Sequence, residues 1–123
     1  MQEIAQYAGE MLQEASVSQT QLAFDEKGLI PVVVQQEKTG EILMVAWANK
    51  EAIRLTFKTH TSWFWSRSRQ ELWNKGATSG NMQQVKYVLA DCDKDTLVYV
   101  VDSPGPACHT GHRSCFFTQL VDG

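Results

Sequence analysis

The chain has 123 residues, of which 43% are hydrophobic and 20% charged, as in an ordinary globular protein. This length suits one domain with its own core, so we expect residues 1–123 to form a single domain. The formal net charge of -3 argues against a protein that binds nucleic acid through a broad basic surface. No apolar segment approaches membrane-spanning length and the N-terminus lacks a signal-peptide pattern, so we expect a cytoplasmic protein without a membrane partner.

The first half of the chain contains signals for two helices and a hairpin. Residues 2–15 place apolar side chains at helical spacing, which predicts a short amphipathic helix. The apolar runs LIPVVVQQ and EILMVAWA are separated by EKTG, whose Gly40 suits a turn, and together they predict a β-hairpin. Asn49 is a good N-cap for KEAIRLTFKTH, which predicts a second helix over residues 50–60.

The second half of the chain is rich in strand signals. SWFWSRS alternates bulky aromatics with small or basic residues, as a strand with one buried face does. QQVKYVLADC and TLVYVVDS predict two strands joined by the acidic turn DCDKD, and CFFTQLV predicts a last strand. The pattern predicts an α+β fold with a mainly antiparallel sheet and a few short helices, because strands that follow one another in sequence usually pair.

The densest group of reactive side chains is GPACHTGHRSC, residues 105–115. It holds Cys108 and Cys115, two of the three cysteines, and two of the three histidines. This density fits a disulfide, a reactive thiol, a closed structural metal site, or a metal with an open position for chemistry. An odd cysteine count without a signal peptide favours reduced thiols over a disulfide framework. The spacing alone leaves metal binding and two buried structural cysteines both open.

The remaining cysteine, Cys92, lies within an acidic run. Asp91, Asp93 and Asp95 occupy every second position there. In an extended conformation alternate residues share one face, so the carboxylates would converge and Cys92 would point away from them. Carboxylate oxygens suit magnesium and a thiolate suits zinc. The alternative is an ordinary solvated acidic turn.

A basic segment, WSRSRQELWNKGATSGN, spans residues 65–81. It combines cationic side chains with hydroxyls and a glycine, which are the usual components of phosphate-binding sites. The candidate residues are Arg67, Arg69, Lys75, Thr78, Ser79 and Gly80. Trp65 and Trp73 could flank a planar base. The alternative is a basic loop beside ordinary core tryptophans.

Four segments, FDEKGLIPVVVQ, SRSRQELWNKGATSGN, ADCDKD and PACHTGHRSCFF, together resemble the phosphoribosyl-AMP cyclohydrolase family of histidine biosynthesis in order and spacing. The resemblance runs from about Leu22 to Phe117 and leaves the predicted N-terminal helix, within residues 1–16, outside. It implies an enzyme that binds Zn²⁺ and Mg²⁺ and forms an intertwined homodimer. The implied reaction is attack of zinc-activated water on adenine C6 of 1-(5-phosphoribosyl)-AMP and hydrolysis of the N1–C6 bond, which leaves a formamidine-linked imidazole carboxamide.

The resemblance also implies roles for individual residues. Cys108 and Cys115 match two zinc ligands of one subunit, and Cys92 matches the third, which comes from the partner subunit. His109 matches a histidine implicated in catalysis, where it would carry a proton from the attacking water to the departing nitrogen. The magnesium ligands match Asp91, Asp93 and Asp95. For the two phosphoribosyl arms we expect Arg67, Arg69, Lys75, Thr78, Ser79 and Gly80.

Two other classes of function remain open at this point. In a zinc-stabilised interaction module, a histidine such as His112 would join the cysteines as a fourth ligand and close the site. In a single-stranded nucleic-acid binder, the tryptophans and arginines would stack on bases. The net charge disfavours the second class.

Overall fold

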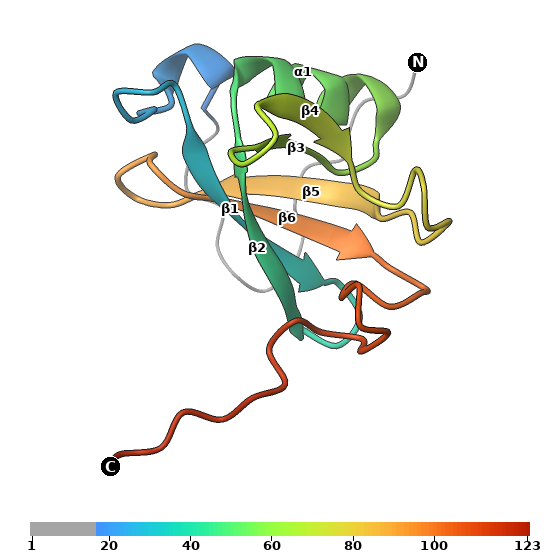
Figure 1. Ribbon diagram of the computed structural model, residues 1–123. Helices are drawn as coiled ribbons and strands as arrows, with labels where there is room; N and C mark the ends of the chain where they lie inside the picture. The colour runs from blue at the N-terminus through green and yellow to red at the C-terminus, as the bar shows by residue number, and fades with distance from the viewer. Residues whose placement is uncertain (1–16) are drawn as a thin grey trace.

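The computed structural model describes residues 17–123, so the predicted helix over residues 2–15 lies outside the described range. A four-stranded sheet forms the centre of the protein (Figure 1). Its strand order is β2-β1-β6-β5, with bounds β1 (Ile30–Gln36), β2 (Ile42–Ala48), β5 (Gln84–Ala90) and β6 (Leu97–Asp102).

The α+β class is confirmed, and the sheet is mixed. The neighbours in sequence pair antiparallel as predicted, β1 with β2 and β5 with β6. The central pair, β1 with β6, is parallel. Those two strands are separated by about half of the chain, so the rule that sequential strands pair gave no information about them.

The single α-helix of the described range, α1 (Lys50–Thr59), forms where predicted. The Asn49 side chain accepts a hydrogen bond from the Ala52 N–H at 2.8 Å and so caps the first turn. The helix ends at Thr59, and the next residue, His60, caps it with a left-handed φ of 61°. It is ten residues long, and no helix among residues 17–123 has the length and apolar character needed to cross a membrane.

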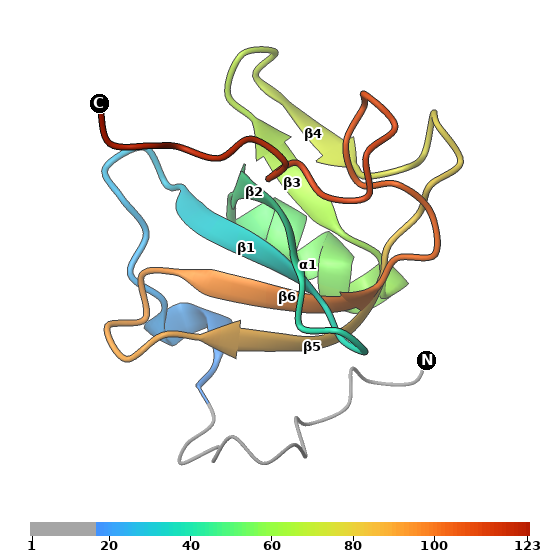
Figure 2. The same cartoon turned by 90° about the horizontal axis from the view of Figure 1, so that it is seen from below.

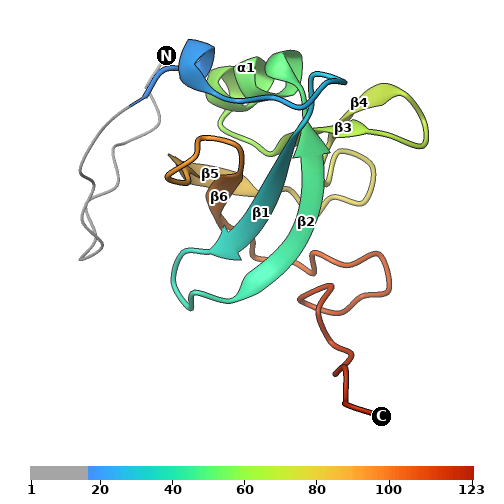
Figure 3. The ribbon, with the colours of Figure 1, turned by 90° about the vertical axis from the view of Figure 1, so that its left-hand side faces the viewer.

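A second, two-stranded sheet lies beside α1. It consists of β3 (Trp63–Ser66), as predicted, and β4 (Glu71–Asn74). This hairpin and α1 lie on the same side of the main sheet (Figures 1 and 3), and the view from below shows the sheet in front of the helix (Figure 2). A short 3-10 turn, η1 (Gln19–Gln21), precedes the sheet.

The core lies between the main sheet and α1. Side chains alternate between the two faces of each strand, and one face of the sheet is buried. Its residues include Ile30, Val32, Val34, Leu97, Tyr99 and Val101. The Tyr99 hydroxyl donates to the Trp63 carbonyl at 3.3 Å, which joins the sheet to β3. Burial of this ring raises the pKa of Tyr99 to about 12.

The opposite face of the sheet carries an apolar row. Val45, Val33, Val98 and Leu89 lie in register across all four strands, on the face turned away from the core. Val45 is 50% exposed and the other three are half-buried. We call these four residues the apolar row.

The last predicted strand, over CFFTQLV, is wrong for this chain. Residues 116–123 contain neither helix nor strand, and the tail runs away from the body of the protein (Figures 1 and 3). Phe116 is 61% exposed and Leu120 96% exposed. Strand-forming residues make a strand only beside another strand edge, and this tail pairs with no described strand of its own chain.

Candidate metal centres and substrate loops

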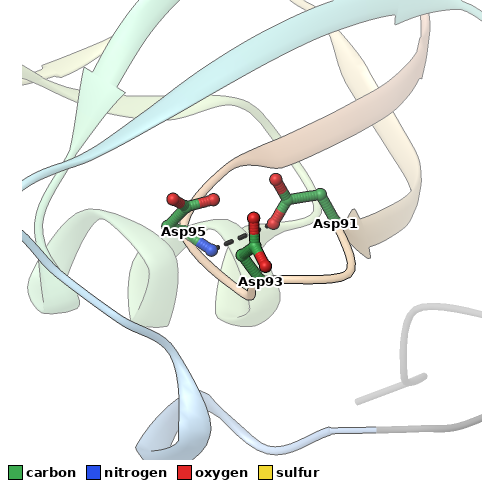
Figure 4. A group of neighbouring side chains, drawn as sticks. All are labelled: Asp91, Asp93 and Asp95. Atoms are coloured by element: carbon green, nitrogen blue, oxygen red, sulfur yellow. Dashed lines mark hydrogen bonds between the residues drawn. The ribbon is translucent and has the colours of Figure 1, made fainter.

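The acidic turn, residues 91–96, joins β5 to β6 and gathers three carboxylates. Oxygen atoms of Asp91, Asp93 and Asp95 all lie within 4.8 Å of one another (Figure 4). Asp91 Oδ1 accepts hydrogen bonds from the N–H groups of Asp95 at 3.0 Å and Thr96 at 3.3 Å. The carboxylates therefore converge as predicted, but a tight turn brings them together and not an extended strand.

The carboxyl groups of this turn titrate differently from one another. Partial loss of hydration acts to raise the pKa of Asp91, but the hydrogen bonds from Asp95, Thr96 and Lys94 outweigh it and lower the pKa overall. The pKa of Asp95 is raised, first by its hydrogen bond with the Asp91 carboxyl, then by burial and by the charges of Asp91 and Asp93. Crowded carboxylate oxygens of this kind fit a hard divalent cation, which relieves their mutual repulsion.

The cysteine loop, residues 103–115, follows β6 and folds back on itself. The Cys108 N–H donates to the His112 carbonyl at 3.1 Å, and Gly111 takes a φ of 93° at the turn between them. The Cys115 N–H donates to the Leu43 carbonyl of β2 at 2.8 Å. The loop is therefore held at its far end by an edge strand from a distant part of the sequence.

This fold brings the free thiols of Cys108 and Cys115 close enough to interact by a hydrogen bond. Hydrogen bonding by Thr110, whose Oγ1 lies 3.0 Å from Cys108 Sγ, lowers the pKa of Cys108, and Cys115 and the charge of Lys75 add to the effect. Burial raises the pKa of Cys115, and so does its hydrogen bond with Cys108. Two neighbouring thiols, one of them with a lowered pKa, fit two positions of a zinc site.

Cys92 does not join this pair within one chain. It is exposed on the acidic turn before β6, whereas Cys108 follows the end of β6. A strand of six residues spans about 20 Å, and Figures 1 and 2 show the two loops at opposite ends of β6. Among residues 17–123, the aspartates of the acidic turn form the only cluster of three or more potential metal ligands.

The loop after β4 packs against the cysteine loop. Gly76 is buried with a φ of 90°, and a Cβ there would lie 2.3 Å from the Asn81 backbone. A Cβ on Gly105 would lie 2.4 Å from Asn81 Oδ1. The charge of Lys75 acts to lower the pKa of both thiols, although the pKa of Cys115 is raised overall, so this ammonium lies near Cys108 and Cys115. The exposed Thr78, Ser79 and Gly80 belong to the same loop.

The two arginines predicted to bind phosphate lie elsewhere, in the turn between β3 and β4. The Arg67 guanidinium lies over the Trp47 ring, 4.5 Å from its centroid. Arg69 Nη1 lies 4.0 Å from a Glu71 carboxylate oxygen. Sequence reasoning missed the contact between Trp47 and Arg67, because no local pattern links residues that are 20 positions apart.

The two histidines of the cysteine loop have different surroundings. His109 is exposed and directly follows Cys108. His112 Nδ1 lies 2.8 Å from Thr110 Oγ1, and its ring stacks on Phe117 with centroids 3.8 Å apart. Sequence reasoning also missed Thr110, although its position two residues after Cys108 was a usable signal.

These features define a class of protein, a small α+β domain with two groups of candidate metal ligands beside a basic loop. Residues 44–117 match the family model of phosphoribosyl-AMP cyclohydrolase. The chain is 61% identical over 95 residues to a phosphoribosyl-AMP cyclohydrolase of Clostridium botulinum (strain 657 / Type Ba4), a match that covers 77% of this chain and 86% of the relative.

Two other relatives extend the comparison. A phosphoribosyl-AMP cyclohydrolase of Archaeoglobus fulgidus is 58% identical over 100 residues, covering 81% of this chain and 93% of the relative. A histidine biosynthesis bifunctional protein of Oceanobacillus iheyensis is 54% identical over 105 residues, covering 85% of this chain and 49% of the relative. The chain belongs to the phosphoribosyl-AMP cyclohydrolase family, the hydrolases of histidine biosynthesis that its motifs predicted.

Proposed function

We propose that the protein hydrolyses the N1–C6 bond of the adenine ring in 1-(5-phosphoribosyl)-AMP, in the cytoplasm. The product is the formamidine-linked imidazole carboxamide intermediate of L-histidine biosynthesis. The observation that carries this proposal is the contact between the Cys108 and Cys115 thiols beside Lys75, in a chain that belongs to this family. Thiols and a cation held together give both a metal site and an anchor for an anionic substrate.

The proposed zinc ligands are Cys108 and Cys115 of one subunit and Cys92 of the other. Zinc held by three thiolates supplies a nucleophile at neutral pH, because it lowers the pKa of a water molecule in its fourth position. The Thr110 hydroxyl, 3.0 Å from Cys108 Sγ, favours the thiolate form that such a site requires. His112 is already engaged by Thr110 and Phe117, which argues against a fourth protein ligand.

The proposed proton carrier is His109. It is exposed beside Cys108, and an imidazole can accept and release a proton near neutral pH. As the water oxygen bonds to C6, His109 takes a proton from it and passes a proton to N1 when the N1–C6 bond breaks. The N1 nitrogen then leaves as the neutral nitrogen of the amidine.

The proposed magnesium ligands are Asp91, Asp93 and Asp95, whose crowded oxygens fit this ion. We propose that the phosphoribosyl arms are bound by cationic side chains and by the hydroxyl and N–H groups of the loop after β4, namely Arg67, Arg69, Lys75, Thr78, Ser79 and Gly80. Lys75 and the loop after β4 adjoin the cysteine loop, which supports their assignment to the same site.

The proposed assembly is an intertwined homodimer. The length of β6 keeps Cys92 away from the thiol pair of its own chain, so a complete set of three thiols requires a second copy. The apolar row also supports this proposal, because a face of four apolar side chains is stabilised by burial against another surface.

The reaction is tested by following ultraviolet absorbance after adding phosphoribosyl-AMP to purified protein, before and after zinc removal. Opening the purine ring changes its spectrum, so we expect turnover that disappears with zinc and returns when zinc is restored. Absence of turnover in zinc-replete, magnesium-supplied protein would contradict the proposed reaction. X-ray absorption that finds four protein ligands and no water oxygen at zinc would favour a closed structural site instead.

The shared site is tested by mixing two inactive variants, Cys92→Ser and Cys108→Ser. In the mixed dimer one of the two sites has all three native cysteines, so we expect partial recovery of activity. Two copies of the same variant serve as the control and should stay inactive. If verified subunit exchange restores nothing, Cys92 does not act across the interface.

A further inference from the structure

Arg67 differs from the other arginines of the chain in its partner. The chain has four arginines, and three of them have a glutamate partner, in the pairs Arg54–Glu51, Arg69–Glu71 and Arg113–Glu41. Arg67 has no carboxylate within 4.0 Å among residues 17–123, and its guanidinium lies over the Trp47 ring. Its positive charge is therefore not matched by a neighbouring acid.

This contact leaves the hydrogen-bonding groups of Arg67 available. Stacking uses the flat face of the guanidinium, whereas the five N–H donors point outward in its plane. The backbone of the turn is also held, because Gln70 Nε2 donates to the Arg67 carbonyl at 2.7 Å and the Gln70 N–H donates to the Ser66 carbonyl at 2.8 Å. The backbone at Arg67 and its guanidinium are therefore both positioned before any ligand arrives, which lowers the entropy lost on binding.

The location of Arg67 and Trp47 fits the proposed substrate. Trp47 lies on edge strand β2, the same strand whose Leu43 carbonyl binds the Cys115 N–H. The two positions are four residues apart, about 13 Å along the strand. The same strand therefore contacts the cysteine loop and holds the aromatic partner of Arg67, so a substrate with two phosphoribosyl arms can extend from one region toward the other.

We propose that Trp47 is a positioning residue that orients Arg67 to bind a phosphate group of the substrate. This inference rests on the proposed function, and it gives Arg67 a larger part in phosphate binding than Arg69, which lies near the Glu71 carboxylate. Trp47 itself acts only through Arg67. Its indole provides the surface on which the guanidinium lies.

The test is steady-state kinetics with phosphoribosyl-AMP on the zinc- and magnesium-loaded enzyme. We expect Trp47→Leu to raise KM about fivefold with kcat nearly unchanged, and the conservative Trp47→Tyr to stay within about twofold, since it keeps an aromatic face. A matched control is Phe24→Leu, which removes the other aromatic partner of an exposed cation, Lys50 at 5.7 Å, and should leave KM unchanged.

A double-mutant cycle separates positioning from a structural role. In an Arg67→Ala background, Trp47→Leu should raise KM no further, because its partner is already absent. The same fivefold factor in that background would overturn the inference, and so would an unchanged KM for Trp47→Leu alone. If Arg67→Ala itself leaves KM unchanged while the wild-type enzyme is active, the phosphate role of Arg67 fails and the reaction assignment stands.

Discussion

The acidic turn and the cysteine loop are both candidate metal sites, but they are assembled over very different distances in the sequence. The three aspartates lie within five consecutive positions, and one turn is enough to gather their oxygens. The thiol pair depends on Leu43 of β2 and on Asn81 packed against Gly105, and its proposed third ligand lies at the other end of β6. A site made in one turn needs only that turn, whereas a site made from distant segments needs the completed fold.

The largest effect is expected at the thiol pair. Cys115→Ser should abolish zinc binding and lower kcat by more than about a thousandfold, because several kcal/mol of transition-state stabilisation is lost with the metal. Metal analysis of the purified variant and the absorbance assay measure the two losses. His112→Ala is the control and should keep its zinc. Zinc loss in that variant would contradict an open site with three thiolates.

A smaller effect is expected at the acidic turn. Asp93→Asn removes one charged oxygen ligand and should raise the magnesium concentration for half-maximal activity by about tenfold, while zinc content stays unchanged. Magnesium titration of activity measures this shift. Asp122→Asn, on the exposed tail, should have no effect. Loss of zinc in Asp93→Asn would show that the two sites are not independent.

The close packing within the loop after β4, which meets the cysteine loop at Asn81 and Gly105, can be tested with two glycines. Gly76 and Gly80 both have positive φ, but a Cβ on Gly76 would lie 2.3 Å from the Asn81 backbone and one on Gly80 would have no atom within 4 Å. Gly76→Ala should therefore reduce the free energy of unfolding by about 2 kcal/mol more than Gly80→Ala. Urea denaturation measures the difference. If both variants lose the same free energy of unfolding, the positive φ alone causes the loss and the contact with Asn81 adds nothing.

The smallest effect is expected from the charge of Asp95 in metal-free protein. Its pKa is raised in the folded state, so its ionised form destabilises the fold at neutral pH, and this destabilisation is lost as the pH falls through that raised pKa. Asp95→Asn should raise Tm slightly at pH 7, with the gain lost as the pH falls to the ordinary aspartate pKa.

The charge of Asp91 is expected to have the opposite effect on stability. Its pKa is lowered in the folded state, so its ionised form stabilises the fold above the ordinary aspartate pKa, and that contribution is lost in acid. Asp91→Asn should therefore lower Tm at pH 7. Thermal denaturation with a chelator at pH 7 and pH 4 measures both variants. A fall in Tm for Asp95→Asn would contradict the repulsion inferred for this turn.

The sequence by itself determined the features that depend on neighbouring residues. Helix α1 begins after Asn49 as predicted because the cap contacts an N–H only three residues away, and Gly40 turns the first hairpin. The aspartates converge because few residues separate them. Even here the local conformation differed from the prediction. The prediction assumed an extended strand, in which alternate residues share a face, whereas hydrogen bonds to the Asp91 carboxylate fold these residues into a turn. The family could also be recognised from the sequence, because its motifs lie within short segments.

Only the tertiary structure decided which distant segments meet. It paired β1 with β6 in parallel, placed Arg67 on Trp47, brought Lys75 to the thiol pair, and left Cys92 at the far end of β6. The three contacts in this list join residues that are far apart in the sequence, and their free energy comes from burial and packing that no local pattern encodes. The tail CFFTQLV also shows that local patterns do not determine tertiary contacts. Its residues favour a strand, but a strand forms only where the fold presents an edge to pair with.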